Sequence, residues 1–260
     1  MRRGAGHIRN EVAIALARRA GYLIKKNIGK VREVSYKGAI NLVTDVDKRA
    51  EDLIAGEIKG RFPEDSILAE ESGALFRKGA FRWIVDPLDG TTNFFRSFPF
   101  FSVSIAVEDE YGVFSGVIYD PLRDELFRAE RSRGAYLNKK RIRVSGISSI
   151  SKGFLATGFS YHVRNRRNTN INNFRKFLKK AFAIRRAGSA ALDMAYVACG
   201  RFDGYWELDI HPWDVAAGRI IVEEAGGKVT RFNGSRFEYS DKDILASNSL
   251  VHSSMSRILR

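Results

Sequence analysis

Two kinds of apolar pattern alternate along the 260 residues of this chain, and their alternation restricts the fold more than any other feature. Apolar residues between 8 and 24 recur every three to four positions, which predicts an amphipathic helix with its Arg and Lys side chains facing water. Short runs rich in β-branched and aromatic residues, such as 81–85, predict strands. Helices and strands that alternate over the whole length predict a mixed α/β fold built in layers.

Start and stop signals place most of the boundaries. Thr44, with Asp47 three residues later, has the pattern of a helix cap, and the helix that it starts is expected to end before Pro63. Glycines close two later helices. Besides 81–85, strands are expected at 66–69, 101–107, 113–119, 124–129, 154–157, 182–186, 202–208, 228–232 and 244–247, and helices at 169–181, 189–199, 213–225 and from 249 onward.

The region from 101 to 129 has the pattern of an antiparallel meander in the middle of a large sheet, with a turn near 109–112. A chain of this length can bury one large core or two fused lobes. We find no repeat and no low-complexity linker, so we predict a single domain over 1–260, with lobes 1–145 and 146–260. The nearest approach to a disordered loop is 164–173.

Cysteine and hydropathy patterns exclude several classes of protein. The single cysteine, Cys199, allows no intrachain disulfide, and the four scattered histidines form no cluster typical of structural zinc. The apolar stretch 12–17 is interrupted by Arg18 and Arg19 and is too short for a signal peptide or a membrane span. We therefore expect a soluble, unprocessed, cytoplasmic protein with no membrane partner.

The net charge of +14 is unevenly distributed along the chain. Residues 1–37 carry a net charge of +8 and residues 123–187 one of +15, so the rest of the chain carries −9. A positive surface raises the encounter rate with anionic partners, either small phosphates or nucleic acid. Charge alone does not decide between them.

The strongest local signal is the segment 86–91, Asp-Pro-Leu-Asp-Gly-Thr, which places two carboxylates three residues apart at the end of an apolar strand. Pro, Asp and Gly are common turn residues, so an ordinary turn is the alternative interpretation. Three features favour a site. Strand ends carry function in α/β folds, the following Gly-Thr-Thr can present backbone N–H groups to an anion, and acids recur in similar contexts at Glu70 and Asp214.

Glu70, Asp86, Asp89 and Asp214 together offer four hard oxygen ligands, which suit Mg²⁺. A pair of such ions can activate a water and stabilise the attacking and leaving oxygens of a phosphoryl transfer. The sequence lacks the Asp-x-Asp pair of aspartyl-phosphate enzymes, the spacing of an EF-hand and the Gly-rich loop of nucleotide triphosphatases. A magnesium-dependent phosphoryl-transfer site is therefore predicted.

The same segments carry a family resemblance. Residues 83–93, Trp-Ile-Val-Asp-Pro-Leu-Asp-Gly-Thr-Thr-Asn, resemble the first signature of the inositol monophosphatase family, and 213–218 with 224–227 resemble the second. Segments 41–47 and 70–72 resemble two further family segments. The resemblance implies a layered αβαβα sandwich, a homodimer, inhibition by lithium, and Mg²⁺-dependent hydrolysis of small phosphate monoesters, with inositol 1-phosphate as the first candidate.

The resemblance also implies roles for individual residues. A first metal ion would be held by Glu70, Asp86, the carbonyl of Leu88 and Asp89, and a second by Asp86, Asp89 and Asp214. The attacking water would be oriented by Asp47 and Thr91, with Glu70 in contact with a metal-bound water. Lobe 1–145 would be mainly metal-binding and lobe 146–260 mainly substrate-binding. Substrate contacts would come from Asp89, Gly90, Thr91, Arg186, Ala190, Glu207 and Asp214.

Several substrates stay open at this stage. Glu207 favours a polyol, whereas the basic run 164–167 would favour fructose 1,6-bisphosphate, the second candidate. Histidinol phosphate and nucleotide 3′-phosphates are further alternatives. A different class of function, RNA binding through the basic surface, is motivated by the charge of 123–187, although no known RNA-binding signature is present.

Overall fold

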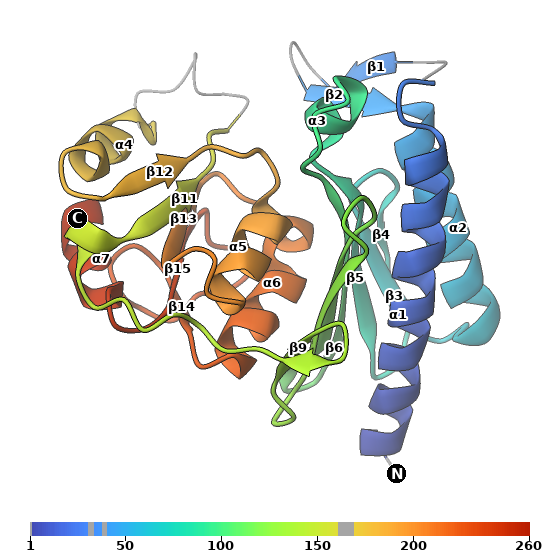
Figure 1. Cartoon of the computed structure of the whole chain (residues 1–260). Helices are drawn as coiled ribbons and strands as arrows, with labels where there is room; N and C mark the ends of the chain where they lie inside the picture. The colour runs from blue at the N-terminus through green and yellow to red at the C-terminus, as the bar shows by residue number, and fades with distance from the viewer. Residues whose placement is uncertain (1, 31–33, 38–40, 161–168) are drawn as a thin grey trace.

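The computed structural model of the chain describes residues 2–30, 34–37, 41–160 and 169–260. Five layers of secondary structure succeed one another across the molecule (Figure 1). A pair of helices covers an eight-stranded sheet, a second pair lies between this sheet and a five-stranded sheet, and a third pair covers the far side. The predicted αβαβα sandwich is therefore confirmed.

The first sheet contains the predicted meander. Its strand order is β10-β9-β8-β7-β6-β5-β3-β4, and every neighbouring pair is antiparallel except β3 and β5. The turn expected near 109–112 joins β6 to β7 in the middle of the sheet. The strands are β3 (Ser66–Ala69), β4 (Gly73–Leu75), β5 (Arg82–Asp89), β6 (Ser102–Asp109), β7 (Gly112–Asp120), β8 (Glu125–Glu130), β9 (Ala135–Leu137) and β10 (Lys140–Arg141).

The second sheet is mixed and has the order β12-β11-β13-β15-β14. Strand β11 pairs in parallel with β12 and β13, while β15 is antiparallel to β13 and β14. A separate hairpin of β1 and β2 precedes α2. The strands are β1 (Val34–Lys37), β2 (Asn41–Thr44), β11 (Phe154–Thr157), β12 (Ala183–Arg185), β13 (Gly204–Leu208), β14 (Lys228–Thr230) and β15 (Asp243–Ser247).

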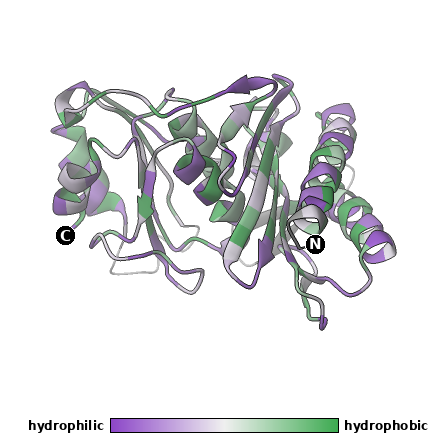
Figure 2. Ribbon diagram, turned by 90° about the horizontal axis from the view of Figure 1, so that it is seen from below, coloured by the Kyte–Doolittle hydropathy of each residue, from purple (hydrophilic) through white to green (hydrophobic). Residues whose placement is uncertain are grey.

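Helices α1 and α2 cover the outer face of the first sheet, α5 and α6 lie between the sheets, and α4 and α7 cover the second sheet (Figures 1 and 2). No helix in the described ranges is both long and apolar enough to span a membrane. The helices are α1 (Arg2–Lys26), α2 (Asp45–Arg61), α3 (Thr91–Phe95), α4 (Ile171–Leu178), α5 (Ala190–Ala198), α6 (Pro212–Glu224), α7 (His252–Leu259) and the 3-10 turn η1 (Ile150–Lys152).

The first sheet is buried on both faces, which explains why its strands have nearly continuous apolar sequences. On β5, Trp83 and Val85 pack into the core under α1 and α2, whereas Ile84 between them packs into the core around α5 and α6. Successive side chains of a strand point to opposite faces, so one apolar run contributes to two cores. Strand β5 is thereby fixed in place, and the polar residues at its end are fixed with it.

Most expected boundaries agree with the structure to within one or two residues. The cap at Thr44 is confirmed, since its side chain accepts from the N–H groups of Val46 and Asp47 while the Asp47 side chain accepts from the N–H of Thr44. The C-terminal helix was expected from 249 but begins at 252, because Ser249 has a positive φ of 70° that no α-helix accommodates.

Other expectations were less accurate. The helix expected at 169–181 covers only 171–178, so the disordered loop expected up to 173 was wrong for its last three residues. The first half of that loop, with the basic run 164–167, lies outside the described residues. Seven short elements, β1, β2, β4, β9, β10, α3 and η1, were not predicted.

His252 gives a stability prediction for this part of the fold. Its ring is buried between the hydroxyls of Thr230 and Ser247, both 2.8 Å away, and burial, with the charge of Lys228, lowers its pKa to about 4. The unfolded chain, with an imidazole pKa near 6.5, therefore binds more protons between pH 4 and 6.5, so this group makes the fold more stable as pH rises through that window. Between pH 7.5 and 5 we expect wild type to lose about 2 kcal/mol relative to His252→Gln.

Denaturant unfolding of both proteins at the two pH values measures this difference. The comparison with His252→Gln is needed because buried carboxyls with raised pKa values, such as Asp47, change stability in the opposite direction over the same range. An equal loss of stability in both proteins would contradict the role of His252.

Candidate active site

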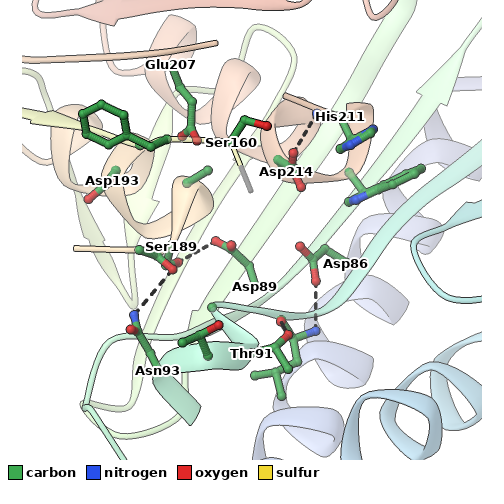
Figure 3. Close-up of a pocket in the computed structure, with 18 of the residues that line it drawn as sticks. Asp86, Asp89, Thr91, Asn93, Ser160, Ser189, Asp193, Glu207, His211 and Asp214 are labelled. Atoms are coloured by element: carbon green, nitrogen blue, oxygen red, sulfur yellow. Dashed lines mark hydrogen bonds between the residues drawn. The ribbon is translucent and has the colours of Figure 1, made fainter. Parts of the chain in front are cut away.

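A cavity of about 460 Å³ lies where β5, α3, α5, β13 and α6 meet (Figure 3). Every site residue predicted from the sequence lines it except Asp47. Asp47 lies behind Thr91, whose hydroxyl donates to Asp47 Oδ1 at 2.8 Å. The predicted residues in the lining are Glu70, Asp86, Leu88, Asp89, Gly90, Thr91, Arg186, Ala190, Glu207 and Asp214.

A bulge at the end of β5 brings Asp86 and Asp89 to the same cavity. Asp86 pairs with Ser104 of β6, and Asp89 pairs with Ser102, so three steps along β5 match two steps along β6. In a regular strand, residues three apart point to opposite faces of the sheet. The extra residue of the bulge changes this alternation, and both carboxylates line the cavity.

Backbone donors hold two of the carboxylates. Asp86 Oδ1 accepts from the N–H of Leu88 at 3.0 Å. Asp214 lies in the first turn of α6, where its Oδ2 accepts from the N–H of His211 at 2.6 Å, and Pro212 starts the helix between them. Each side chain is therefore fixed through one of its two oxygens.

Asp89 connects the two halves of the chain. Its Oδ2 accepts from the Ser189 hydroxyl at 2.5 Å and from the N–H of Ala191 at 2.8 Å, at the start of α5. A carboxylate at this position satisfies a free N–H of the helix and complements its dipole. Nearby, the Asn93 amide donates to the carbonyls of Ala187 (2.8 Å) and Phe100 (2.7 Å). The start of α5 is thereby fixed against the end of β5.

The acids of the cavity are strongly coupled. Burial raises the pKa of Asp86 and of Asp214, and the negative charge of Glu70 raises both further. Burial also raises the pKa of Asp89 to about 6, although the hydrogen bonds from Ser189 and α5 oppose the shift. Buried acids that repel one another favour their neutral forms, and a bound cation favours their ionised forms.

The donor set fits a hard divalent cation, because it consists of carboxylates and the carbonyl of Leu88. In the described part of the chain, however, no three acidic, imidazole or thiol side chains already stand in a metal-binding arrangement. In the hydrogen bonds described above, Asp86, Asp89 and Asp214 each accept through one carboxylate oxygen.

Asp47 is a second kind of acid, buried beside the cavity rather than in it. Burial raises its pKa to about 6, while hydrogen bonds from Thr44 and Thr91 oppose the shift. The single hydroxyl proton of Thr91 has two acceptors, Asp47 Oδ1 at 2.8 Å and the carbonyl of Leu88 at 3.1 Å. When it is donated to Asp47, the Thr91 oxygen can accept a hydrogen bond from a water in the cavity.

Sequence reasoning missed several residues of the lining. Ser189 was expected only as a helix start, and its hydrogen bond to Asp89 joins residues that are one hundred positions apart in the sequence. Asp193 stands in an apolar helix, where nothing in the local pattern separates it from a surface acid. His211 lines the cavity with its ring stacked on Trp213. The other lining residues are Thr92, Asn93, Gly158, Phe159, Ser160, Gly188 and Asp209.

Glu51 was also missed, and it supports the loop after Glu70. It is buried on α2, and its two carboxylate oxygens accept from the N–H groups of Glu71 (2.9 Å) and Ser72 (2.8 Å). We expect Glu51→Ala to lower kcat/KM at least about tenfold, because a shift of the loop misplaces Glu70. Steady-state kinetics with Asp52→Ala, an exposed acid of the same helix, as control measures this. Equal rates for the two variants would show that Glu51 does not position the loop.

The chain matches the model of the inositol monophosphatase family over residues 9–259. It belongs to this family. It is 46% identical over 251 residues to the inositol-1-monophosphatase of Synechocystis sp., across 96% of this chain and 88% of that protein. It is 43% identical to the Nus factor SuhB of Escherichia coli K12, across 96% and 94%. The crystal structure of extragenic suppressor protein SuhB from Bartonella henselae, 40% identical, superposes with a TM-score of 0.92 across 96% and 97%.

Membership of the inositol monophosphatase family confirms two predictions, the family resemblance and the class of enzyme. The protein is a phosphatase, a hydrolase of phosphate esters. The family is generally metal-dependent, in agreement with the coupled acids of the cavity.

Proposed function

We propose that this phosphatase hydrolyses small phosphate monoesters with Mg²⁺, and that inositol 1-phosphate is its preferred substrate. One observation carries the proposal: acids from three distant segments, Glu70, Asp86 with Asp89, and Asp214, line one cavity. The inositol-1-monophosphatase of Synechocystis, 46% identical to the chain, supports the choice of substrate.

The acids divide between two proposed metal positions. Glu70, Asp86, Asp89 and the Leu88 carbonyl would hold one Mg²⁺, and Asp86, Asp89 and Asp214 a second. Mg²⁺ bound there would supply Lewis acidity, which polarises the phosphoryl group and lowers the pKa of a coordinated water. Without a cation, the same acids would repel the phosphate.

Asp47 and Thr91 would orient the attacking water. The Thr91 hydroxyl can accept a hydrogen bond from the water while it donates to Asp47 Oδ1 at 2.8 Å. The proton released by the water could then pass through the Thr91 hydroxyl to Asp47, whose pKa of about 6 suits a base near neutral pH. Asp47 needs no direct contact with the substrate in this arrangement.

The backbone N–H groups of Gly90 and Thr91 would bind the phosphate. The structure gives two reasons why position 90 is glycine. Its φ is +95°, and a Cβ there would lie 3.0 Å from the carbonyl oxygen of Phe100 and 3.2 Å from that of Gly188. A side chain would therefore displace the turn that carries both donors.

The alcohol part of the substrate would lie toward β13 and α5, against Glu207, Arg186 and Ala190. Glu207 is held by a hydrogen bond from the Tyr205 hydroxyl, and burial raises its pKa to about 7. It also packs against Gly158, where a Cβ would lie about 2.1 Å from a carboxylate oxygen. The side chain is thereby fixed in a position from which it could bind a sugar-alcohol hydroxyl.

A substrate panel tests this proposal. Phosphate release is measured from inositol 1-phosphate, fructose 1,6-bisphosphate, histidinol phosphate and a nucleotide 3′-phosphate, all with Mg²⁺. We expect the highest kcat/KM for inositol 1-phosphate. A higher value for fructose 1,6-bisphosphate would replace the proposed substrate with the bisphosphate and leave the proposed site intact.

A second candidate function, RNA binding, is favoured by one feature of the surface. Between residues 142 and 202 the only acid is the buried Asp193. Five cations on α4, at the two positions after it and on β12 are exposed on the outer layer and edge of the second sheet. The similarity to a protein named Nus factor SuhB supports a role beyond hydrolysis. The exposed cations are Arg175, Lys176, Lys179, Lys180 and Arg185.

Titration of a short single-stranded RNA at 50 and 200 mM salt tests this second function. We expect binding that weakens with salt, and a slope that falls by about 0.7 for each phosphate contact removed in the double variant Lys179→Gln, Lys180→Gln. The same charge change at Lys25 and Lys26, on the opposite outer layer, is the control. Absence of binding at 50 mM salt would end this candidate.

Three expectations remain predictions. The homodimer and the inhibition by lithium come from the family resemblance, and the cytoplasmic location comes from composition. The division into a metal-binding lobe 1–145 and a substrate-binding lobe 146–260 is also a proposal, with the qualification that Asp214, a proposed metal ligand, belongs to the second segment.

A further inference from the structure

Asp193 is a buried carboxyl in the cavity for which the mechanism above has no use. It lies in the first turn of α5 with only 1% of its surface exposed, and it is part of the cavity lining. Its Oδ1 atom is buried and has no hydrogen-bond partner among the described residues. Burial of an unpaired carboxyl oxygen destabilises a fold, so such an atom calls for a functional explanation.

Other buried aspartates in the described ranges have clear structural partners. Asp65 accepts from Arg9 and from the Trp83 indole, and Asp203 accepts from the Ser145 hydroxyl and the N–H of Phe154. These aspartates hold segments of the fold together. Asp193 differs from them because its buried oxygen is left for a partner that enters the cavity.

The surroundings of Asp193 indicate the chemistry of that partner. Burial raises the pKa of Asp193, the negative charges of Glu207 and Asp89 raise it further, and the positive charge of Arg186 opposes them. Glu207 and Arg186 belong to the end of the cavity assigned above to the alcohol, so Asp193 lies near that end. In Figure 3, Asp89 lies between Asp193 and Asp86. A second phosphate at this end would meet two carboxyl groups, Asp193 and Glu207, whereas a hydroxyl would be compatible with both.

We propose that Asp193 binds a hydroxyl group of the leaving alcohol, and that together with Glu207 it selects polyol monophosphates. A hydroxyl both donates and accepts, so it can satisfy the buried Oδ1 whether the carboxyl is charged or neutral. A site built to bind a hydroxyl rejects an analogue that lacks it, because the buried polar atom is then left unpaired. This inference rests on the proposed function and adds a specificity-determining residue to it.

The test compares two substrates in wild type, Asp193→Ala and Asp193→Asn. Inositol 1-phosphate carries hydroxyls on its leaving alcohol, and p-nitrophenyl phosphate carries none. For Asp193→Ala we expect kcat/KM to fall about tenfold on inositol 1-phosphate, mainly through KM, and to change less than about twofold on p-nitrophenyl phosphate. Asp193→Asn, which keeps a polar atom in place, should recover part of the loss.

Thermal unfolding gives a second readout and separates this role from a structural one. Removing an unpaired buried carboxyl should raise the unfolding midpoint of Asp193→Ala, whereas Asp203→Asn, a buried aspartate outside the cavity, should lower the midpoint and leave the ratio of the two substrates unchanged. An equal fall on both substrates, or an unchanged ratio, would overturn the role of Asp193. A wild type inactive on both esters would instead refute the proposed function.

Discussion

Asp86→Asn is expected to lower turnover at least about a thousandfold while the protein stays folded. Asp86 is assigned to both proposed metal positions, so its loss removes charge from each, and the electrostatic stabilisation of a transferring phosphoryl group is lost with it. The fold should persist because an asparagine oxygen can still accept the 3.0 Å hydrogen bond from the N–H of Leu88.

The same substitution, Asp86→Asn, should increase thermal stability in the absence of metal. Burial and the charge of Glu70 disfavour the ionised form of Asp86, so in EDTA the neutral variant should unfold at a higher temperature than wild type. Mg²⁺ should stabilise wild type, by about 2.7 kcal/mol at one hundred times its dissociation constant, and have much less effect on the variant. Kinetics and thermal unfolding, each with and without Mg²⁺, measure both effects.

Asp120→Asn is the matched control for Asp86→Asn. Asp120 is equally buried, but it accepts from the N–H of Leu122 and from Arg123, outside the cavity. Its replacement should lower stability and leave both turnover and stabilisation by Mg²⁺ nearly unchanged. An Asp86→Asn protein with normal turnover would refute the assignment of the site.

Asp47→Asn is expected to lower kcat by about 10² to 10⁴ with little change in KM, because Asp47 acts on the attacking water through Thr91 and not on the substrate. In wild type, burial raises the pKa of Asp47 to about 6, so protonation should lower kcat as pH falls through 6. The variant should have lost this limb of the pH profile.

Variants of Thr91 separate orientation of the water from packing. Thr91→Ser keeps the hydroxyl and should keep most of the turnover, whereas Thr91→Val removes it and should approach the rate of Asp47→Asn. The pH dependence of kcat for the four proteins measures this. If Asp47→Asn retained wild-type kcat, or if Thr91→Val were as active as Thr91→Ser, the proposed path for the proton would be wrong.

The sequence was informative wherever one local pattern determined one local structure. Thr44 and Asp47 form the predicted cap because both partners lie within one helical turn. Trp83 to Val85 forms the predicted strand because every position of that run is buried. The carboxylates proposed to bind metal could be picked out because each stands at or near the end of an element, where an apolar pattern changes to acid.

Contacts across the sequence could not be predicted in this way. The bulge that aligns Asp86 with Asp89 depends on pairing with β6, and nothing in segment 86–89 alone distinguishes it from a turn. From the sequence alone, Glu51 cannot be distinguished from the other acids of an amphipathic helix. Both of its carboxylate oxygens, however, accept hydrogen bonds from the loop about twenty residues later. Asp193 reads as a surface acid, because its burial depends on how α5 packs between the two sheets.

Phosphate release from inositol 1-phosphate, followed with Mg²⁺, after chelation with EDTA and after Mg²⁺ is added back, tests the central claim most directly. The coupled carboxyls of the cavity predict turnover that requires the metal, is lost with EDTA and returns with Mg²⁺. Turnover that persists in EDTA, or no release from any phosphate monoester under these conditions, would contradict the assignment of these carboxyls as the metal-binding centre of the enzyme.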